Sequence, residues 1–265
     1  LPCTSKITGV IRTIIMNLKL IMPMAGMGSR FEDAGYTTSK PMIDVNGIPM
    51  FVHAERTIGL DFDERIFIVR KEQQLKESIL EWYPDAIVHE LDRLTEGTAC
   101  TILSVQDWLS ADDSIFVSNC DQHTVWTSLD AVRNAVADSN VDGLISVFHC
   151  PEKDPKWSYA EIDDVGKVMR VAEKDPISDW ATVGWYYWNK SNVLLACSRN
   201  MIDAGDSAKV NGEYYVAPLF NHMPQDDNPD TGVRIGTVVV NEMTPVGTPE
   251  DLMFYLGLED MSELD

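Results

Sequence analysis

Two glycines and two cations that follow an apolar run make up the part of this chain best suited to binding phosphate. Residues 18–24 are apolar except for Lys19, and Gly26, Gly28, Arg30 and Lys40-Pro41 come after them. The glycines let the backbone turn sharply and approach a ligand with no Cβ in the way, and successive backbone N–H groups in such a turn form an anion-binding concavity. Arg30 and Lys40 add positive charge suited to phosphate oxygens. The pattern therefore predicts a phosphate-binding loop flanked by two cations.

This loop differs from two common phosphate-binding motifs. No Gly-Lys-Ser/Thr closes it as in a Walker A loop, and Phe31 stands where a dinucleotide fingerprint needs its third glycine. Instead, Gly26-x-Gly28-Ser29-Arg30-Phe31 followed by Lys40-Pro41-Met42 resembles the signature of the sugar-1-phosphate nucleotidylyltransferases. The resemblance implies a Rossmann-like fold and a triphosphate bound by Ala25, Gly26, Met27, Gly28 and Ser29, with Arg30 and Lys40 as catalytic residues. The alternative is a tight turn with two surface cations.

Strands and helices that alternate along the chain must hold this loop. We expect strands at 18–24, 65–70, 86–91, 114–118 and 142–148, and helices at 49–59, 71–82 and 98–108. Largely apolar strands that alternate with helices predict a mostly parallel α/β sheet covered by helices on both faces. Ligands bind such sheets beyond the carboxyl ends of the strands, where the glycine loop lies.

Two further segments of the first half carry candidate site residues. Asp121 follows the strand at 114–118, and the resemblance implies that its carboxylate and the substrate phosphates bind Mg²⁺. The alternative is that Asp121 caps a helix near 128–137. The resemblance also implies that Gly97 and Thr98 line the base pocket, whereas the residue types alone predict Thr98 as the N-cap of a helix.

The second half of the chain changes to antiparallel strands. Residues 159–162 and 168–172 predict a hairpin, and 181–188 predict a further strand interrupted by Gly184. The resemblance implies that this small antiparallel lobe binds the acceptor. Glu173 would contact sugar hydroxyls, Lys174 the acceptor phosphate, and Gly184 would present its backbone to the sugar. The alternative for Glu173 and Lys174 is an exposed ion pair.

The chain departs from the family pattern near its end. Residues 247–252 resemble the family's closing Gly-Thr-Pro-Glu-Asp-Leu helix, with Thr248 as N-cap and Pro249 at its first position. The family's second metal ligand stands two residues before this glycine, and here that position is Pro245. Either Asn241 or Glu242 substitutes for it, or the metal relies on Asp121 and phosphate oxygens alone.

Composition restricts the partners and the compartment. The formal net charge of −21 argues against nucleic acids and anionic membranes, because both attract basic surfaces. The five cysteines are dispersed and form no CxxC pair, which predicts a reducing compartment, the cytoplasm.

We expect residues 1–15 to be a leader outside the fold and 16–265 to form one domain. Its nucleotide-binding half is about 16–150 and its acceptor-binding half about 151–265.

Together these features predict an enzyme that transfers a nucleoside monophosphate from a nucleoside triphosphate to a sugar-1-phosphate. Pyrophosphate leaves, and the NDP-sugar would serve polysaccharide biosynthesis. The sequence leaves open whether the protein forms a homo-oligomer. One alternative is a cytidylyltransferase for a phosphoamino acid, polyol phosphate or phosphocholine. In that case an aromatic cage for a quaternary ammonium would come from Trp157, Trp185, Tyr187 and Trp188. The alternative, and the commoner role of such residues, is packing inside the lobe. The other alternative, suggested by Pro245, is a sensor that binds a nucleotide-sugar without catalysis.

Overall fold

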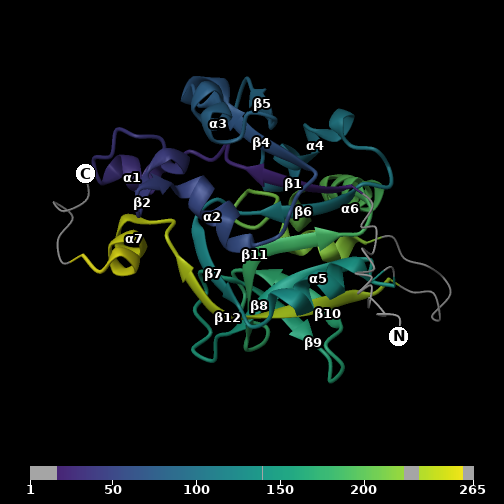
Figure 1. Cartoon of the computed structure of the whole chain (residues 1–265). Coiled ribbons are helices and arrows are strands. Elements are labelled where there is room, and N and C mark those ends of the chain that lie inside the picture. Colours follow the sequence, from purple (N-terminus) through teal and green to yellow (C-terminus); the bar gives the residue numbers. More distant parts are fainter. Residues whose placement is uncertain (1–16, 139, 224–232, 259–265) are drawn as a thin grey trace, which may run out of the picture.

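One mixed sheet carries the architecture of the chain (Figure 1). The computed structural model describes residues 17–138, 140–223 and 233–258, so the expected leader at 1–15 lies outside the described residues. The sheet has the strand order β5-β4-β1-β6-β11-β8-β12-β7, and the hairpin β9–β10 joins it through β11. Its ten strands are β1 (Leu18–Pro23), β4 (Glu64–Arg70), β5 (Ile87–Leu91), β6 (Ser114–Ser118), β7 (Gln122–Trp126), β8 (Gly143–His149), β9 (Ser158–Ile162), β10 (Val168–Glu173), β11 (Trp180–Trp188) and β12 (Ile235–Pro245).

The sheet confirms the predicted parallel arrangement around the glycine loop. Strands β5, β4, β1 and β6 run parallel, as do β8 and β12. Strand β11 is antiparallel to both of its neighbours, and β7, which the sequence did not predict, is antiparallel to β12. Strands from the beginning and the end of the chain therefore lie in one sheet. A separate small hairpin, β2 (Asp44–Val45) and β3 (Ile48–Pro49), precedes the first long helix.

Helices cover both faces of the sheet because its strands are apolar on both sides. In β1, Leu20 and Met22 face one apolar cluster while Ile21 faces the other. The first cluster includes α2 (Met50–Ile58), α3 (Lys76–Trp82) and α5 (Leu129–Ala137), and the second includes α4 (Thr98–Leu103) and α6 (Ser191–Asp203). At one end of the molecule, α1 (Ser29–Asp33) lies near α7 (Pro249–Leu256), around Phe31 and Leu252 (Figure 1).

Two predicted helices are shorter than expected. Residues 71–82 do not form one helix, because a 3-10 turn at Lys71–Gln73 ends at Gln74, whose φ is +54°. The Gln73 side chain bends back instead, accepting a hydrogen bond from the backbone N–H of Arg70 at 2.7 Å. Likewise, α4 ends at Leu103, and residues 106–108 form a separate 3-10 turn.

Among the helices of the described residues, none is both long and apolar enough to cross a membrane.

Candidate active site

A cavity of about 690 Å³ opens where β1 and β6 end, between the glycine loop and the β9–β10 hairpin. Strand β1 pairs with β4 on one side and with β6 on the other, so the order of strands reverses here, a usual place for ligands in such sheets. The volume suits a small-molecule site. Most of the predicted site residues line it: Gly26, Gly28, Arg30, Lys40, Thr98, Asp121, Glu173, Lys174 and Gly184. Four predicted residues are not among those that line it: Ala25, Met27, Ser29 and Gly97.

The glycine loop is held from behind by one side chain at the end of β4 and one from the 3-10 turn that follows it. Arg70, only 5% exposed, donates a hydrogen bond to the carbonyl of Ala25. Gln73 donates to the carbonyl of Met24 at 3.2 Å and to the Ser39 hydroxyl at 3.3 Å. These contacts explain why Ala25 is buried beneath the loop rather than part of its wall. Sequence reasoning missed both positioning residues, because their partners are 34 to 49 residues away along the chain.

At the bend, Gly28 brings the loop against Lys40. Gly28 has a φ of +72°, and a Cβ there would lie 3.2 Å from the Cβ of Lys40, so the position favours glycine on two counts. Met27 points outward with 52% of its surface exposed, and Ser29 begins α1. Arg30 is exposed on α1 and lines the cavity with Lys40. The loop therefore presents backbone and two cations to one hollow.

Lys40 and Asp121 form an ion pair at the base of the cavity. Burial alone would lower the pKa of the Lys40 ammonium, but the adjacent Asp121 carboxylate outweighs burial and raises it, so Lys40 is charged at neutral pH. A Cβ on Gly247 would lie 2.5 Å from Asp121 Oδ2 and 3.4 Å from Lys40 Nζ. The backbone N–H of Val246 also donates to the Asp121 carbonyl at 2.9 Å. The chain at 246–247 thus packs directly onto the ion pair.

Cys120 lines the same cavity without being a nucleophile. Burial, and to a smaller degree the neighbouring Asp121 carboxylate, raise the pKa of its thiol to about 12. The thiolate is the reactive form of cysteine, so this thiol is inert at neutral pH. Cys120 is therefore a packing residue of the cavity wall at neutral pH.

The residues around Asp121 fit a magnesium ion that arrives with a triphosphate. Mg²⁺ is usually bound through one or two carboxylates, with substrate phosphates and water completing its shell. From the end of β12, Met243, Pro245 and Gly247 line the cavity, whereas Asn241 and Glu242 are not among its lining residues. Among the described residues, no group of three or more His, Cys, Asp or Glu side chains could hold a metal. The two candidate substitutes on β12, Asn241 and Glu242, therefore lie outside the wall of this cavity.

The helix-cap alternative for Asp121 is wrong. Ser128 is the N-cap of α5, and its hydroxyl accepts a hydrogen bond from the backbone N–H of Ala131 at 3.2 Å. Asp121 lies before β7, with its side chain paired with Lys40.

Near the chain end, the prediction that Thr248 is the N-cap of the last helix is confirmed. Its hydroxyl accepts a hydrogen bond from the Asp251 N–H at 3.1 Å, and Pro249 begins α7.

Thr98 lines the cavity but does not cap its helix. The N-cap of α4 is Gly97, and Thr98 is the first residue of the helix. Gly97 has a φ of +128°, and a Cβ there would lie 2.4 Å from the backbone nitrogen of Tyr214. Hydrogen bonds from Tyr214 N–H to Glu96 and from Ala99 N–H to Tyr214 fix this approach. Gly97 therefore serves to pack two backbone segments, one of which leads into the cavity wall at Tyr215.

Glu173 and Lys174 turn to separate partners, so the predicted alternative of an exposed ion pair is wrong. The Ser158 hydroxyl donates to the Glu173 carboxylate, and burial raises the pKa of Glu173. Lys174 has a φ of +56° and donates from Nζ to the Tyr215 hydroxyl at 2.7 Å. A side chain in this uncommon backbone region is often held there for function. Both groups line the cavity opposite the glycine loop.

Position 184 requires glycine because a neighbouring side chain leaves no room for a Cβ. Its φ is +91°, and a Cβ there would lie 2.4 Å from the side-chain amide nitrogen of Asn119. Its carbonyl accepts a hydrogen bond from the Asn119 N–H at 3.1 Å. The close approach that the sequence indicated is therefore between β11 and the chain that follows β6, at the edge of the cavity.

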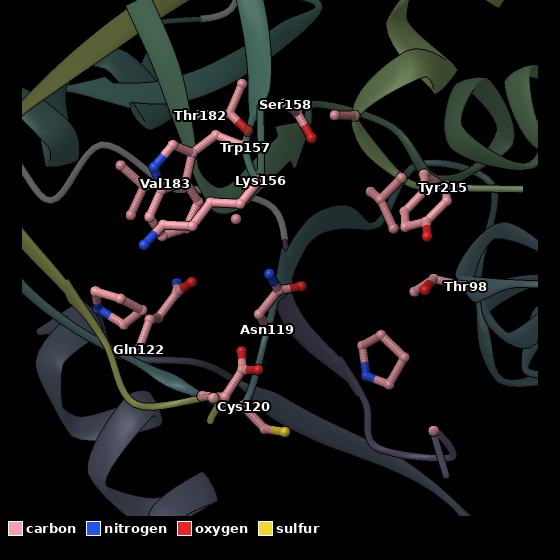
Figure 2. A pocket seen from close by; sticks show the side chains of 18 of the residues that line it. Thr98, Asn119, Cys120, Gln122, Lys156, Trp157, Ser158, Thr182, Val183 and Tyr215 are labelled. Atoms are coloured by element: carbon pink, nitrogen blue, oxygen red, sulfur yellow. The ribbon is translucent and has the colours of Figure 1, made fainter. Parts of the chain in front are cut away.

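Lys156, Asn119 and Tyr215 also line the cavity, and the sequence did not predict them as site residues. Figure 2 shows Lys156 and Trp157 on one side, Thr98 and Tyr215 on the opposite side, and Asn119 between them. Lys156 Nζ lies 4.8 Å from the centre of the Trp157 ring. Of the four aromatic residues predicted to form a cage, Trp157 lines the cavity. The packing alternative is confirmed for the other three, which are at most 3% exposed in the core: Trp185, Tyr187 and Trp188.

The charge of the cavity differs from that of the whole chain. The chain has 21 basic and 42 acidic residues. Among the described residues that line the cavity, the cations Arg30, Lys40, Lys156 and Lys174 outnumber the acids Asp121, Glu173 and Asp251. Because nearby charges dominate binding at physiological salt, this hollow can attract anions despite the acidic surface around it.

Comparison with known proteins agrees with this geometry. The family model described as "Nucleotidyl transferase" matches residues 19–228. A solved structure of the nucleoside-diphosphate-sugar pyrophosphorylase from Vibrio cholerae RC9 is similar, with a TM-score of 0.74 and 26% identity, over 90% of this chain and 99% of that one.

A more distant structure has the same fold. The inositol-1-phosphate CTP transferase from T. maritima matches with a TM-score of 0.66 and 14% identity, over 93% of this chain and 95% of that one. At this identity the likeness concerns the fold alone. A search of curated proteins finds no significant match.

Proposed function

The chain belongs to the nucleotidyl transferase family, and from this premise we propose that it joins a nucleoside triphosphate to a sugar-1-phosphate, giving an NDP-sugar and pyrophosphate. One observation carries the proposal. A single cavity is lined by Arg30, Lys40 and Asp121 at one end and by Glu173 and Lys174 at the other. Such an arrangement supports a reaction that holds two phosphorylated substrates side by side.

The reaction needs no nucleophile from the protein. An oxygen of the acceptor phosphate, already ionised, forms a bond to the α-phosphorus. The bond from the α-phosphorus to the bridging oxygen breaks, and pyrophosphate leaves with that electron pair. The barrier then falls through positioning and through neutralising the phosphate charges. Arg30 and Lys40 supply this charge, and the protonated Cys120 agrees with a site that forms no covalent intermediate.

We propose that Asp121 holds Mg²⁺ together with the triphosphate. The ion, when bound, neutralises phosphate charge and orients the triphosphate. The contribution of the chain is to hold the Asp121 carboxylate in place, which Lys40 and the packing of Gly247 achieve.

The cysteines support a reducing compartment such as the cytoplasm, because four of them are free thiols: Cys100, Cys120, Cys150 and Cys197.

Several contacts support a sugar phosphate over a quaternary ammonium as the acceptor. The aromatic ring of Trp157 faces the Lys156 ammonium at 4.8 Å, and that of Tyr215 faces the Lys174 ammonium at 4.6 Å. A cationic headgroup would meet these ammonium groups rather than free aromatic faces. The carboxyl of Glu173 and the hydroxyls of Ser158 and Thr182 suit a ligand with several hydroxyl groups.

Pyrophosphate release in Mg²⁺ tests the proposal. Each common nucleoside triphosphate is paired with several sugar-1-phosphates, and with inositol phosphate and phosphocholine as non-sugar acceptors. We expect release with sugar-1-phosphates, and a loss of about 100-fold or more in the Arg30→Ala variant, because it lacks a preorganised charge. Release with the non-sugar acceptors alone, or full activity in the variant, would overturn the proposal.

A further inference from the structure

The part of the cavity proposed to bind the acceptor presents two ammonium groups, and they come from adjoining segments of the chain. Lys156 lies over Trp157 on one side, and Figure 2 shows Tyr215, the partner of Lys174, on the other. Both lysines line the cavity. One monophosphate at Lys174 would leave the Lys156 ammonium without a ligand group.

Neither ammonium is held by a tight, buried carboxylate. Lys156 Nζ lies 3.5 Å from Asp154 Oδ2, and the two side chains are 48% and 40% exposed. Exposed pairs of this kind contribute about 0–1 kcal/mol, so a ligand can replace Asp154 easily. Lys174 donates to the neutral hydroxyl of Tyr215. Lys40 differs, since its pair with Asp121 is three-quarters buried.

A backbone hydrogen bond places the segments that carry these two lysines side by side. The N–H of Lys174 donates to the carbonyl of Trp157 at 3.0 Å, which ties β10 to the segment that carries Lys156. The Trp157 ring packs edge-on against Phe148 at 5.6 Å, so the platform beneath Lys156 is anchored in the sheet. Two cations on adjoining segments favour a ligand that carries two anionic groups over a ligand that carries one.

We propose that the acceptor carries a second anionic group, a carboxylate or a further phosphate, and that Lys156 binds it. This rests on the proposed function, which assigns the reacting phosphate to Lys174. The acceptor class is then an acidic sugar-1-phosphate or a sugar bisphosphate. Lys156 thereby becomes a specificity-determining residue of the acceptor end.

Matched acceptors test this inference. Glucose-1-phosphate is compared with glucuronic acid 1-phosphate and with glucose 1,6-bisphosphate. In the first of these C6 is a carboxylate, and in the second the C6 hydroxyl carries a phosphate. We expect the wild type to prefer at least one doubly anionic acceptor by about tenfold or more in kcat/KM, the size of one charge-assisted hydrogen bond. Lys156→Gln should reduce that preference about tenfold. The doubly anionic acceptor with the larger kcat/KM relative to glucose-1-phosphate identifies the second group as a carboxylate or a phosphate.

A neighbouring lysine provides the matched control. Lys153 lies in the same connection, pairs with Asp179 at 3.1 Å and is 48% exposed, but it is not among the residues that line the cavity. Lys153→Gln removes the same charge and should keep the preference. Equal loss in both variants would mean that only the general charge of the lobe matters, and would overturn the inference.

Acceptor binding without nucleotide separates this inference from the proposed reaction. Calorimetry with the same acceptors should show tighter binding of a doubly anionic acceptor to the wild type, weakened in Lys156→Gln. If that result comes without pyrophosphate release from any pair, the second-anion inference stands and the transferase proposal fails. If glucose-1-phosphate binds and reacts as well as both acidic acceptors, the inference fails and the transferase proposal stands.

Discussion

The two ends of the cavity are built in different ways. At the nucleotide end, Gly26, Gly28, Arg30 and Lys40 come from one short stretch of chain. Their supports are buried or paired, through Arg70 beneath the loop and Asp121 beside Lys40. This end can therefore change little without disturbing the sheet beneath it.

The acceptor end gathers residues from distant segments. Lys156 precedes β9, Glu173 ends β10, Thr182 lies on β11, and Tyr215 follows α6. Its two lysines rest on aromatic rings rather than on tight carboxylate partners. The contrast suggests a division of labour, in which the nucleotide end supplies charge to a common reaction and the acceptor end decides which molecule receives the nucleotide.

Replacing Lys40 and Lys174, one lysine from each end of the cavity, tests this division most strongly. We expect Lys40→Met to lower kcat about 1,000-fold, because a preorganised charge near the reacting phosphorus is lost. Lys174→Met should lower kcat/KM for the acceptor about tenfold, with little change in KM for the triphosphate. Initial rates of pyrophosphate release, with each substrate varied in turn, measure both effects.

A third lysine controls for the general loss of charge. Lys71→Met removes an exposed cation that pairs with Asp92 and is not among the residues lining the cavity. It should leave the rates near those of the wild type. If Lys40→Met and Lys174→Met reduced the same kinetic constant to the same degree, the two ends would not have separate roles.

A smaller substitution separates the shape of the glycine loop from its stability. A Cβ on Gly26 would meet no atom within 4 Å, and its φ is not among the positive ones. We expect Gly26→Ala to change the free energy of unfolding by less than about 1 kcal/mol while raising KM for the triphosphate about tenfold, because the methyl group faces the cavity. Chemical denaturation and steady-state kinetics provide the two measurements.

Gly143→Ala is the reciprocal control. A Cβ there would lie 2.7 Å from the Phe220 ring, far along the sheet from the loop. It should destabilise the fold and leave KM for the triphosphate near its original value. A Gly26→Ala protein that unfolds readily but binds the triphosphate normally would show that this glycine serves folding rather than phosphate binding.

The difference between the two ends also explains what the sequence could predict. Strands β1 and β6 are apolar runs, and the loop after β1 is a local motif, so both were predicted from neighbouring residues. The Lys156–Trp157 platform has no local pattern of this kind. It becomes part of a site because Lys174 N–H bonds to Trp157. Strand β7 was missed for a similar reason, since its partner β12 lies more than a hundred residues away.

The failed aromatic cage shows how burial overrides a suggestive composition. Trp185 and Tyr187 point to one face of β11, and Tyr186 and Trp188 to the other. Because β11 lies between β6 and β8, helices cover both faces and most of its rings become core. Central strands of a sheet are largely apolar whatever their function, so the sequence alone could not distinguish packing from recognition.

The smallest expected effect concerns Glu173, whose burial raises the pKa of its carboxyl above that of the unfolded chain. The native state therefore incurs a cost for ionising Glu173. The cost is absent below the unfolded value of about 4.5, grows as the pH rises through the native pKa, and is complete above it. Glu173→Gln removes the cost and still offers Ser158 an acceptor oxygen. At pH 7 we expect its Tm to exceed that of the wild type by about 2 °C.

Thermal unfolding from pH 4 to pH 8 measures the difference, which should vanish at the acid end. Glu81→Gln, an exposed carboxylate on α3, should show no such pH-dependent gain. Such a gain would mean that the acceptor end keeps an ionised Glu173 at a cost in stability, unlike the paired charges of the nucleotide end. If Glu173→Gln were less stable than the wild type at every pH, Lys174 would be stabilising an ionised Glu173, and the acceptor end would be as firmly paired as the nucleotide end.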